Sequence, residues 1–158
     1  MESKPVSGVT YSKNEARITL SKVHDTPGMA AKIFSPISDL GITVDMIIQN
    51  TRAGDLTDMT FTVPRSDYEQ AMQLVEKVAQ EIGAERVSGS KNIAKVSIVG
   101  MGMRNHAGIA TKMFQALAKE GINIMMISTS EIKVSCIIEE KYTELAVRTL
   151  HETFELEK

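Results

Sequence analysis

The strongest constraint on the fold is an internal repeat. The sequence resembles itself when each residue from Pro27 onward is aligned with the residue 80 positions later, so that Pro27 is aligned with Ala107. Between residues 27 and 48, eight of the 22 positions are identical to their counterparts at 107 to 128. Average composition gives about one or two such identities by chance. The identical pairs are Gly28 and Gly108, Ala30 and Ala110, Lys32 and Lys112, Phe34 and Phe114, Gly41 and Gly121, Ile42 and Ile122, Met46 and Met126, and Ile47 and Ile127. A chain of 158 residues is therefore expected to hold two small copies of one unit.

Each copy has the same predicted order of elements, β-α-β-β-α. Alternating or β-branched segments predict the strands. They lie at 16–22, 42–49 and 56–63 in the first copy and at 94–100, 122–129 and 132–139 in the second. The first helix is predicted to start with Thr26 as N-cap and Pro27 as first helical residue, and its twin to run from Gly108 to Gly121. The helix that closes the first copy is predicted to start with a capping box of Ser66 and Glu69.

With one more strand per copy, this order gives an α+β fold of the ferredoxin-like type. Each copy would be a four-stranded antiparallel sheet with two helices on one face. Two segments that share Val-Ser-Gly, at about 5–12 and 84–90, supply the extra strands. We expect a first domain at 14–91, closed by the strand that follows it, and a second domain at 92–157 completed by the N-terminal strand 5–12. The alternative is that each strand pairs with the copy after it.

Composition excludes several classes of function. Eighteen Lys and Arg against twenty Asp and Glu give a net charge of −2, which lacks the excess of positive charge typical of proteins that bind nucleic acid or an anionic membrane. The single cysteine, Cys136, cannot form an internal disulfide, and no Cys/His spacing matches a metal site. The sequence shows neither the apolar core of a signal peptide nor an apolar run of the roughly 18 residues that span a membrane. We therefore expect a cytoplasmic protein without a metal, nucleic-acid or membrane partner.

A glycine-rich segment between a predicted strand and helix superficially resembles a dinucleotide-binding loop. Its glycines are Gly100, Gly102 and Gly108, and the spacing from the second to the third is twice what the fingerprint needs. No GxxxxGK[ST] phosphate loop occurs either. The sequence therefore predicts no nucleotide cofactor in this chain.

The segment VHDTPGMA at 23–30 carries the most specific candidate site. Its tight turn is predicted to aim the free amides of residues 28–30 at an anion such as the α-carboxylate of an amino acid. Asp25 can accept an ammonium group, and Gln49 on the adjacent strand offers a donor and an acceptor. The alternative is that Asp25 only caps the helix.

Several motifs together resemble the tandem ACT-domain regulatory region of aspartate kinase over nearly the whole chain. They include HDTPGMAAKIF, ITVDMIIQN, KVSIVGMGM, HAGIATKMFQAL and, most specifically, ISTSEIKVS. The resemblance implies two ACT domains that bind threonine, lysine or both together and mediate feedback inhibition, and we favour threonine. It also implies pairing of chains through these domains, either as a separate small subunit or as part of a longer kinase. The ATP, the Mg and the catalytic residues would belong to a kinase domain that this sequence lacks, so the chain would not catalyse alone and would partner the catalytic chain.

The resemblance places effector-binding residues in both copies. They are Asp25, Thr26, Pro27, Gly28, Met29, Ala30, Thr43, Val44, Asp45 and Gln49 in the first, and Ile109, Ala110, Asn123, Ile124, Ser130 and Glu131 in the second. In the second copy Asn105 replaces Asp25 and Ala107 replaces Pro27, so an ammonium partner is lost and two equivalent sites are not expected.

Two other functions remain open from the sequence. One is a structural domain that only dimerises. The other is a ferredoxin-like RNA-binding module, which is disfavoured because no RNP motif occurs and Tyr11, Tyr68 and Tyr142 are scattered.

Overall fold

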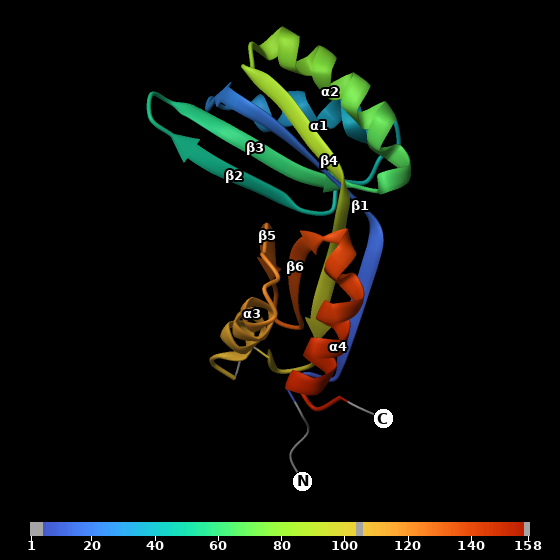
Figure 1. Ribbon diagram of the computed structural model, residues 1–158. Helices are drawn as coiled ribbons and strands as arrows, with labels where there is room; N and C mark the ends of the chain where they lie inside the picture. Colours follow the sequence, from blue (N-terminus) through green and yellow to red (C-terminus); the bar gives the residue numbers. More distant parts are fainter. Residues whose placement is uncertain (1–4, 104–105, 157–158) are drawn as a thin grey trace. The chain divides into compact units, whose positions relative to one another are not determined.

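The computed structural model describes residues 5–103 and 106–156 and divides into two compact units (Figure 1). One unit is Asn14–Lys91, and the other joins the segment that ends at Lys13 to the chain from Asn92 onward. Each unit has two helices packed on one face of an antiparallel sheet. The predicted α+β, ferredoxin-like fold is confirmed.

The unit Asn14–Lys91 has the strand order β2-β3-β1-β4. Its elements are β1 (Gly8–His24, of which the second part lies here), α1 (Met29–Asp39), β2 (Ile47–Arg52), β3 (Leu56–Val63), the 3-10 turn η1 (Arg65–Asp67), α2 (Tyr68–Ile82) and the first part of β4 (Arg86–Val99). Alternate strand residues pack against α1 and α2, and the Phe34 ring meets the Phe61 ring edge-on at 5.1 Å between centroids. The predicted strand 56–63 is confirmed in full.

The other unit has the order β1-β4-β6-β5. Besides the remaining parts of β1 and β4, it contains α3 (Ile109–Lys119), β5 (Met126–Thr129), β6 (Lys133–Glu139), the 3-10 turn η3 (Glu140–Tyr142) and α4 (Thr143–Thr153). Its core includes Met113, Leu117 and Leu150, all fully buried. Val6, just before β1, is buried in the same core with 1% of its surface exposed.

β1 and β4 are each one long strand, so the prediction of separate strands at 5–12 and 16–22, and at 84–90 and 94–100, was wrong. No glycine or proline separates the members of either pair, and the extended backbone continues through Lys13 and Lys91. The Ser7 amide donates to the Val99 carbonyl at 2.8 Å, and the Glu85 amide donates to the Ser21 carbonyl at 2.9 Å. These two bonds show that β1 and β4 run antiparallel.

Both helices at the starts of the copies begin later than predicted. The N-cap of α1 is Gly28, whose φ of 88° is left-handed, so Thr26 is not the N-cap and Pro27 is not the first helical residue. α3 repeats this geometry with Gly108 at φ 89°. Glycine adopts a left-handed backbone conformation readily, whereas a residue with a Cβ is strained there. This explains why both positions hold glycine.

The predicted capping box before α2 is also wrong. The turn η1 precedes the helix, and Ser66 uses its amide to donate to Asn14 Oδ1 at 3.2 Å. The Glu69 carboxylate instead pairs with the Lys91 ammonium at 2.8 Å. The long strand β4 places Lys91 beside the start of α2, a contact that local sequence spacing does not reveal.

β2 and β5 are shorter than the predicted strands 42–49 and 122–129. Ile47 lies opposite Phe61, so residues before 45 extend past the end of β3 and have no strand to pair with. Likewise Met126 lies opposite Ile137, and residues before 124 extend past β6. Within the described residues, no helix is long and apolar enough to cross a membrane.

Candidate functional site

The start of α1 presents amide groups that no described residue accepts, among them those of Gly28 and Ala30. The Lys32 amide closes the first turn on the Gly28 carbonyl at 3.1 Å, and the Met29 amide donates to the Thr26 carbonyl at 3.2 Å. The expectation that the Met29 amide is free was therefore wrong. Gly28 and Ala30 donate to no acceptor within the described part of the chain. Unpaired amides at a helix start carry partial positive charge and attract an anion.

Asp25 lies just before this turn and is fixed by the β2-β3 hairpin. Its amide donates to the Asp55 carbonyl at 2.8 Å, and its carboxylate Oδ1 accepts a hydrogen bond from Gln49 Nε2 at 3.3 Å. Among the described residues the carboxylate accepts nothing from the amides of α1, so the alternative that Asp25 caps the helix is wrong. Both side chains are exposed, and each retains capacity for further hydrogen bonds.

The segment between α1 and β2 holds Thr43, Val44 and Asp45, which therefore precede the strand instead of belonging to it. Thr43 and Val44 line a hollow of about 510 Å³ together with Phe34 and Ile47. The Asp45 amide donates to the Thr62 carbonyl at 3.0 Å. Neither Asp25 nor Gln49 lines this hollow, so the structure gathers the predicted residues of the first copy into two groups.

The second copy has a hollow of about 260 Å³ at the start of α3. It brings together the predicted residues Ile109, Ala110 and Ser130 with the unpredicted residues Met103, His106, Gly108, Thr129 and Val134. Ser130 closes the β5-β6 hairpin, because its amide donates to the Lys133 carbonyl at 2.7 Å. Thr129 is the repeat counterpart of Gln49, so the repeat itself contained the signal that would have found it.

Three other predicted positions of the second copy do not line this hollow. Asn123 and Ile124 lie in the segment before β5, where Ile124 packs on the core, and Glu131 is exposed in the β5-β6 turn. Asn105, expected to replace Asp25, lies outside the described residues.

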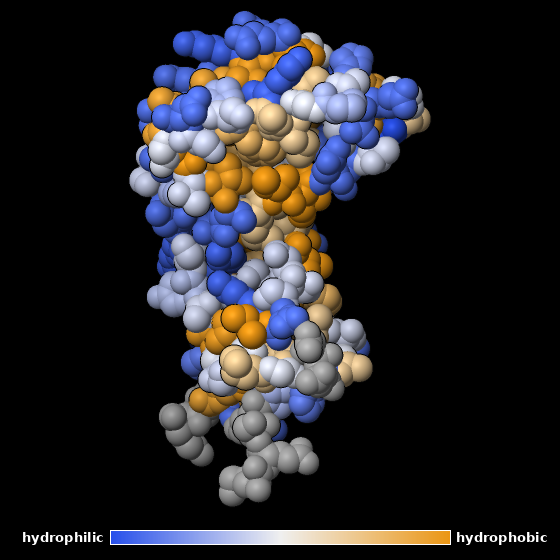
Figure 2. Space-filling view, turned by 180° about the vertical axis from the view of Figure 1, so that it is seen from behind, coloured by the Kyte–Doolittle hydropathy of each residue, from blue (hydrophilic) through white to orange (hydrophobic). Residues whose placement is uncertain are grey.

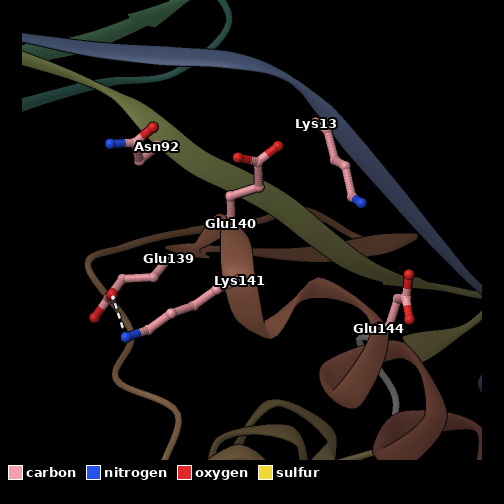
Figure 3. Close-up of a pocket in the computed structure, with 6 residues that line it drawn as sticks. All are labelled: Lys13, Asn92, Glu139, Glu140, Lys141 and Glu144. Atoms are coloured by element: carbon pink, nitrogen blue, oxygen red, sulfur yellow. Dashed lines mark ion pairs between the residues drawn. The ribbon is translucent and has the colours of Figure 1, made fainter.

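A charged hollow of about 570 Å³ lies elsewhere, between β1, β4, η3 and α4 (Figure 3). Its lining residues are Lys13, Asn92, Glu139, Glu140, Lys141 and Glu144, and Lys141 Nζ lies 3.7 Å from Glu139 Oε2. None of the predicted site residues lines it. Its carboxylates lie among ammonium groups, so it has no single charge to select a ligand.

Neither a reactive cysteine nor a metal centre emerges from the described residues. Burial raises the pKa of the Cys136 thiol to about 12, so the group stays protonated and unreactive. The described residues contain no cluster of three His, Cys, Asp or Glu side chains that could hold a metal ion. The α1 site itself offers amide donors for a carboxylate and the Asp25 carboxylate for an ammonium group.

Comparison with known proteins identifies the family of both units. Residues 17–80 and residues 96–154 each match an ACT domain family. A crystal structure of aspartokinase alpha and beta subunits is 52% identical with a TM-score of 0.90, over 96% of this chain and 99% of that chain. The ligand-free regulatory subunit of aspartate kinase from Thermus thermophilus is 42% identical, also with a TM-score of 0.90 and the same coverage. The chain belongs to the tandem ACT-domain regulatory family of aspartate kinase.

Some relatives are longer than this chain. An aspartate kinase from Stutzerimonas stutzeri is 58% identical over 157 residues, which is 99% of this chain. An aspartokinase from Helicobacter pylori is 46% identical over 158 residues. The chain spans 38% of the length of each of these relatives. It corresponds to the regulatory part of aspartate kinase, as the motifs predicted.

Proposed function

We propose that this ACT-domain chain binds an end-product amino acid and thereby mediates feedback inhibition of an aspartate kinase. The observation that carries the proposal is the pairing of Asp25 with Gln49 near the amides of Gly28 and Ala30, which donate to no acceptor among the described residues. The amides suit an α-carboxylate, and Asp25 suits an α-ammonium group. The two groups together select a zwitterion.

Threonine is the favoured effector, with lysine, or both in concert, as the alternative. Gln49 can donate to or accept from a hydroxyl, which suits the threonine side chain. Lysine requires a carboxylate farther from the α-carbon, and Asp45 or Glu131 would supply it. Thr26, Pro27 and Met29 would shape the loop around the ligand.

The ACT domains are inferred to be residues 14–91 and residues 5–12 with 92–157, of which residue 157 lies outside the described residues. The division of the chain between Lys13 and Asn14 and between Lys91 and Asn92 supports these boundaries. The partner would be the aspartate kinase catalytic chain or domain, which would hold the ATP and Mg, in the cytoplasm. The effector would act by binding the inhibited state more tightly than the active state, because only a difference in affinity shifts the equilibrium.

A homodimer is proposed because each unit exposes apolar surface on an edge strand. Ile47 on β2 is 53% exposed and its repeat partner Ile127 on β5 is 44% exposed. Apolar surface lies among polar side chains on the face that Figure 2 shows. A second chain that covers these strands would remove both the apolar surface and the unpaired strand edges.

Isothermal titration of the purified chain with each proteinogenic amino acid tests the proposed function. We expect threonine to bind, and we expect Asp25→Asn to weaken its binding at least tenfold because the ammonium loses its charged partner. Asp39→Asn is the matched control, since Asp39 is an exposed aspartate at the other end of the same helix. A folded chain that binds neither threonine nor lysine would refute ligand binding.

The exposed edge strands also favour a second candidate, a domain that only dimerises. Light scattering separates the two functions. A dimer of unchanged affinity with every amino acid, together with silent titrations, would favour the structural role.

A further inference from the structure

β1 contains a bulge shortly before the effector loop. Leu20 lies opposite Met59 and Val23 lies opposite Thr57, so β1 has one more residue than β3 over this interval. The bulge residue Lys22 has a left-handed φ of 56°. A left-handed backbone is unfavourable for a lysine and persists only where neighbouring groups hold it.

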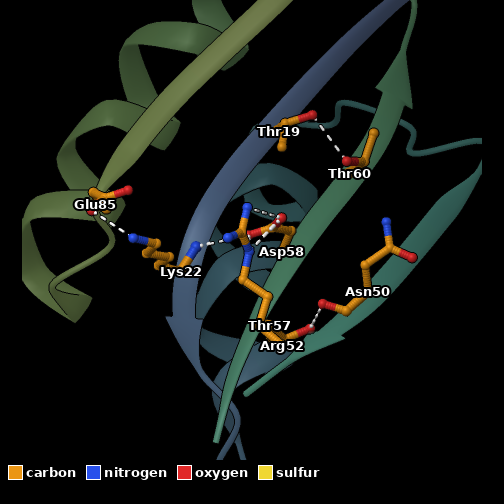
Figure 4. Close-up of polar contacts among 8 residues, drawn as sticks. All are labelled: Thr19, Lys22, Asn50, Arg52, Thr57, Asp58, Thr60 and Glu85. Atoms are coloured by element: carbon orange, nitrogen blue, oxygen red, sulfur yellow. Dashed lines mark hydrogen bonds and ion pairs between the residues drawn. The ribbon is translucent and has the colours of Figure 1, made fainter. Parts of the chain in front are cut away.

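The β2-β3 hairpin supplies the group that holds the bulge (Figure 4). The Lys22 amide donates to Asp58 Oδ1 at 2.9 Å. Arg52 fixes the same carboxylate, because its Nε lies 2.8 Å from both Asp58 oxygens and a second nitrogen lies 2.8 Å from Oδ2. The Lys22 ammonium pairs with Glu85 at 3.1 Å, but both side chains are well exposed and this pair contributes little.

The second copy has no bulge at this place, because β4 pairs with β6 from Ile93 to Val99 in one unbroken register. Gly102, whose φ is 74°, lies in the turn after β4, beyond the residues that pair with β6. β6 carries no aspartate, and its one carboxylate, Glu139, lies at its far end from the hairpin turn. The aspartate clamp is therefore specific to the first copy, which is also the copy with Asp25.

The bulge determines where Asp25 lies. After Lys22, the strand pairs Val23 with Thr57 and His24 with Leu56, and the next residue is Asp25, whose amide donates to the Asp55 carbonyl. A strand that slips by one residue turns every side chain to the opposite face of the sheet. Loss of the bulge would therefore displace the Asp25 carboxylate from Gln49 and from the amides of α1.

We propose that Asp58 is a positioning residue of the effector site, which holds the Lys22 bulge and thereby places Asp25 for the ligand's ammonium group. The inference rests on the proposed function, because it concerns how that site is built. Asp58 does not touch the ligand. It affects affinity indirectly, because its bond to the Lys22 amide determines the backbone conformation of β1 that leads to Asp25.

A double-mutant cycle tests the proposal by titration of the full chain with threonine and, in parallel, by thermal unfolding without ligand. Asp58→Ala is expected to weaken threonine binding about tenfold. Lys22→Gly in the same chain is expected to restore affinity to within about threefold of Lys22→Gly alone, because glycine holds the bulge unaided. A purely structural role would lower the unfolding temperature without this rescue of affinity.

Two further variants make the outcome decisive. Asp58→Asn keeps an oxygen that accepts the Lys22 amide, so it is expected to bind more tightly than Asp58→Ala and replaces it if that variant does not fold. Glu85→Ala removes the side-chain pair of Lys22 and leaves the bulge intact, so its affinity should equal that of the unaltered chain. Unaltered affinity in Asp58→Ala, or failure of Lys22→Gly to restore it, would overturn the inference. An unaltered chain that binds no amino acid would instead refute the proposed function.

Discussion

Replacement of Gly100 by alanine should detach the segment at Pro5, Val6 and Ser7 from the core that contains Val6. Gly100 follows β4, and a Cβ there would overlap the carbonyl oxygen of Pro5 and lie 2.9 Å from the Cα of Val6. These are backbone atoms, so no side-chain rotation relieves the overlap. The segment that holds Pro5, Val6 and Ser7 has to move away.

The cost of that movement follows from what the segment contributes. Val6 is 1% exposed, and loss of its burial costs about 1.5–3 kcal/mol. The bond from the Ser7 amide to the Val99 carbonyl contributes about 0.5–1.5 kcal/mol. Gly100→Ala should therefore lower the free energy of unfolding by about 2–4.5 kcal/mol, which corresponds to a fall in Tm of roughly 4–18 °C for a chain of this size.

Urea and thermal unfolding followed by circular dichroism measure this loss. Gly8→Ala is the matched control, because a Cβ at Gly8 would lie 3.4 Å from Val99 Cγ2, which a small adjustment of a side chain accommodates. We expect the control to change stability by less than about 1 kcal/mol. Equal stability of the two variants would show that Gly100 is not required for the contact with Pro5.

Three smaller effects are also expected. Cys136 should react with a thiol reagent only after unfolding, because burial raises its pKa to about 12, and rapid labelling of the folded chain would contradict this. Thr62→Val should cost about 1–3 kcal/mol in urea unfolding, since the fully buried Thr62 hydroxyl accepts the Met46 amide at 3.0 Å. The hydrogen bond from Arg52 and the Lys22 amide lower the pKa of Asp58, so its stabilisation is present above the unfolded value of about 3.9 and disappears as pH falls through the folded value. Stability should therefore fall more steeply below about pH 4 in the unaltered chain than in Asp58→Asn, and parallel curves would refute the contribution of Asp58.

The repeat predicted the fold because it fixed the number of units and the order of elements, both of which depend on hydrophobic periodicity. Element boundaries were predicted less well where long-range contacts decide them. Residues 42–44 alternate like a strand, yet β3 ends at Val63 and leaves them without a partner. Ser66 and Glu69 have the spacing of a capping box, yet the Glu69 carboxylate forms an ion pair with Lys91 from β4. A local pattern does not contain these competing partners.

The candidate site likewise has features that the sequence predicted and features that it did not. The sequence predicted Asp25 and Gln49 close together, and they do form a hydrogen bond. Gln49, however, lies inside β2, which β3 separates from β1, so the two strands are not neighbours as the prediction assumed. The bond of the Met29 amide to Thr26 could not be predicted, because it depends on the left-handed Gly28. Asp58 was missed because its role depends on the register between β1 and β3, and a bulge of one residue is not visible in a single sequence.

The two copies of the repeat are more alike in backbone conformation than in the side chains around their helix starts. Gly28 and Gly108 have φ values of 88° and 89°, and both begin a helix of equal length. The side chains around the two helix starts differ, with Gln49 in the first copy and Thr129 in the second. Equal backbones would supply equal anion-binding amides. The first copy adds the Asp25 carboxylate, which accepts a hydrogen bond from Gln49, whereas the second copy has Asn105 at that sequence position. If Asp25 is required for the ammonium group, titration should give one strong site per chain, and two sites of equal affinity would show that the amides alone determine binding.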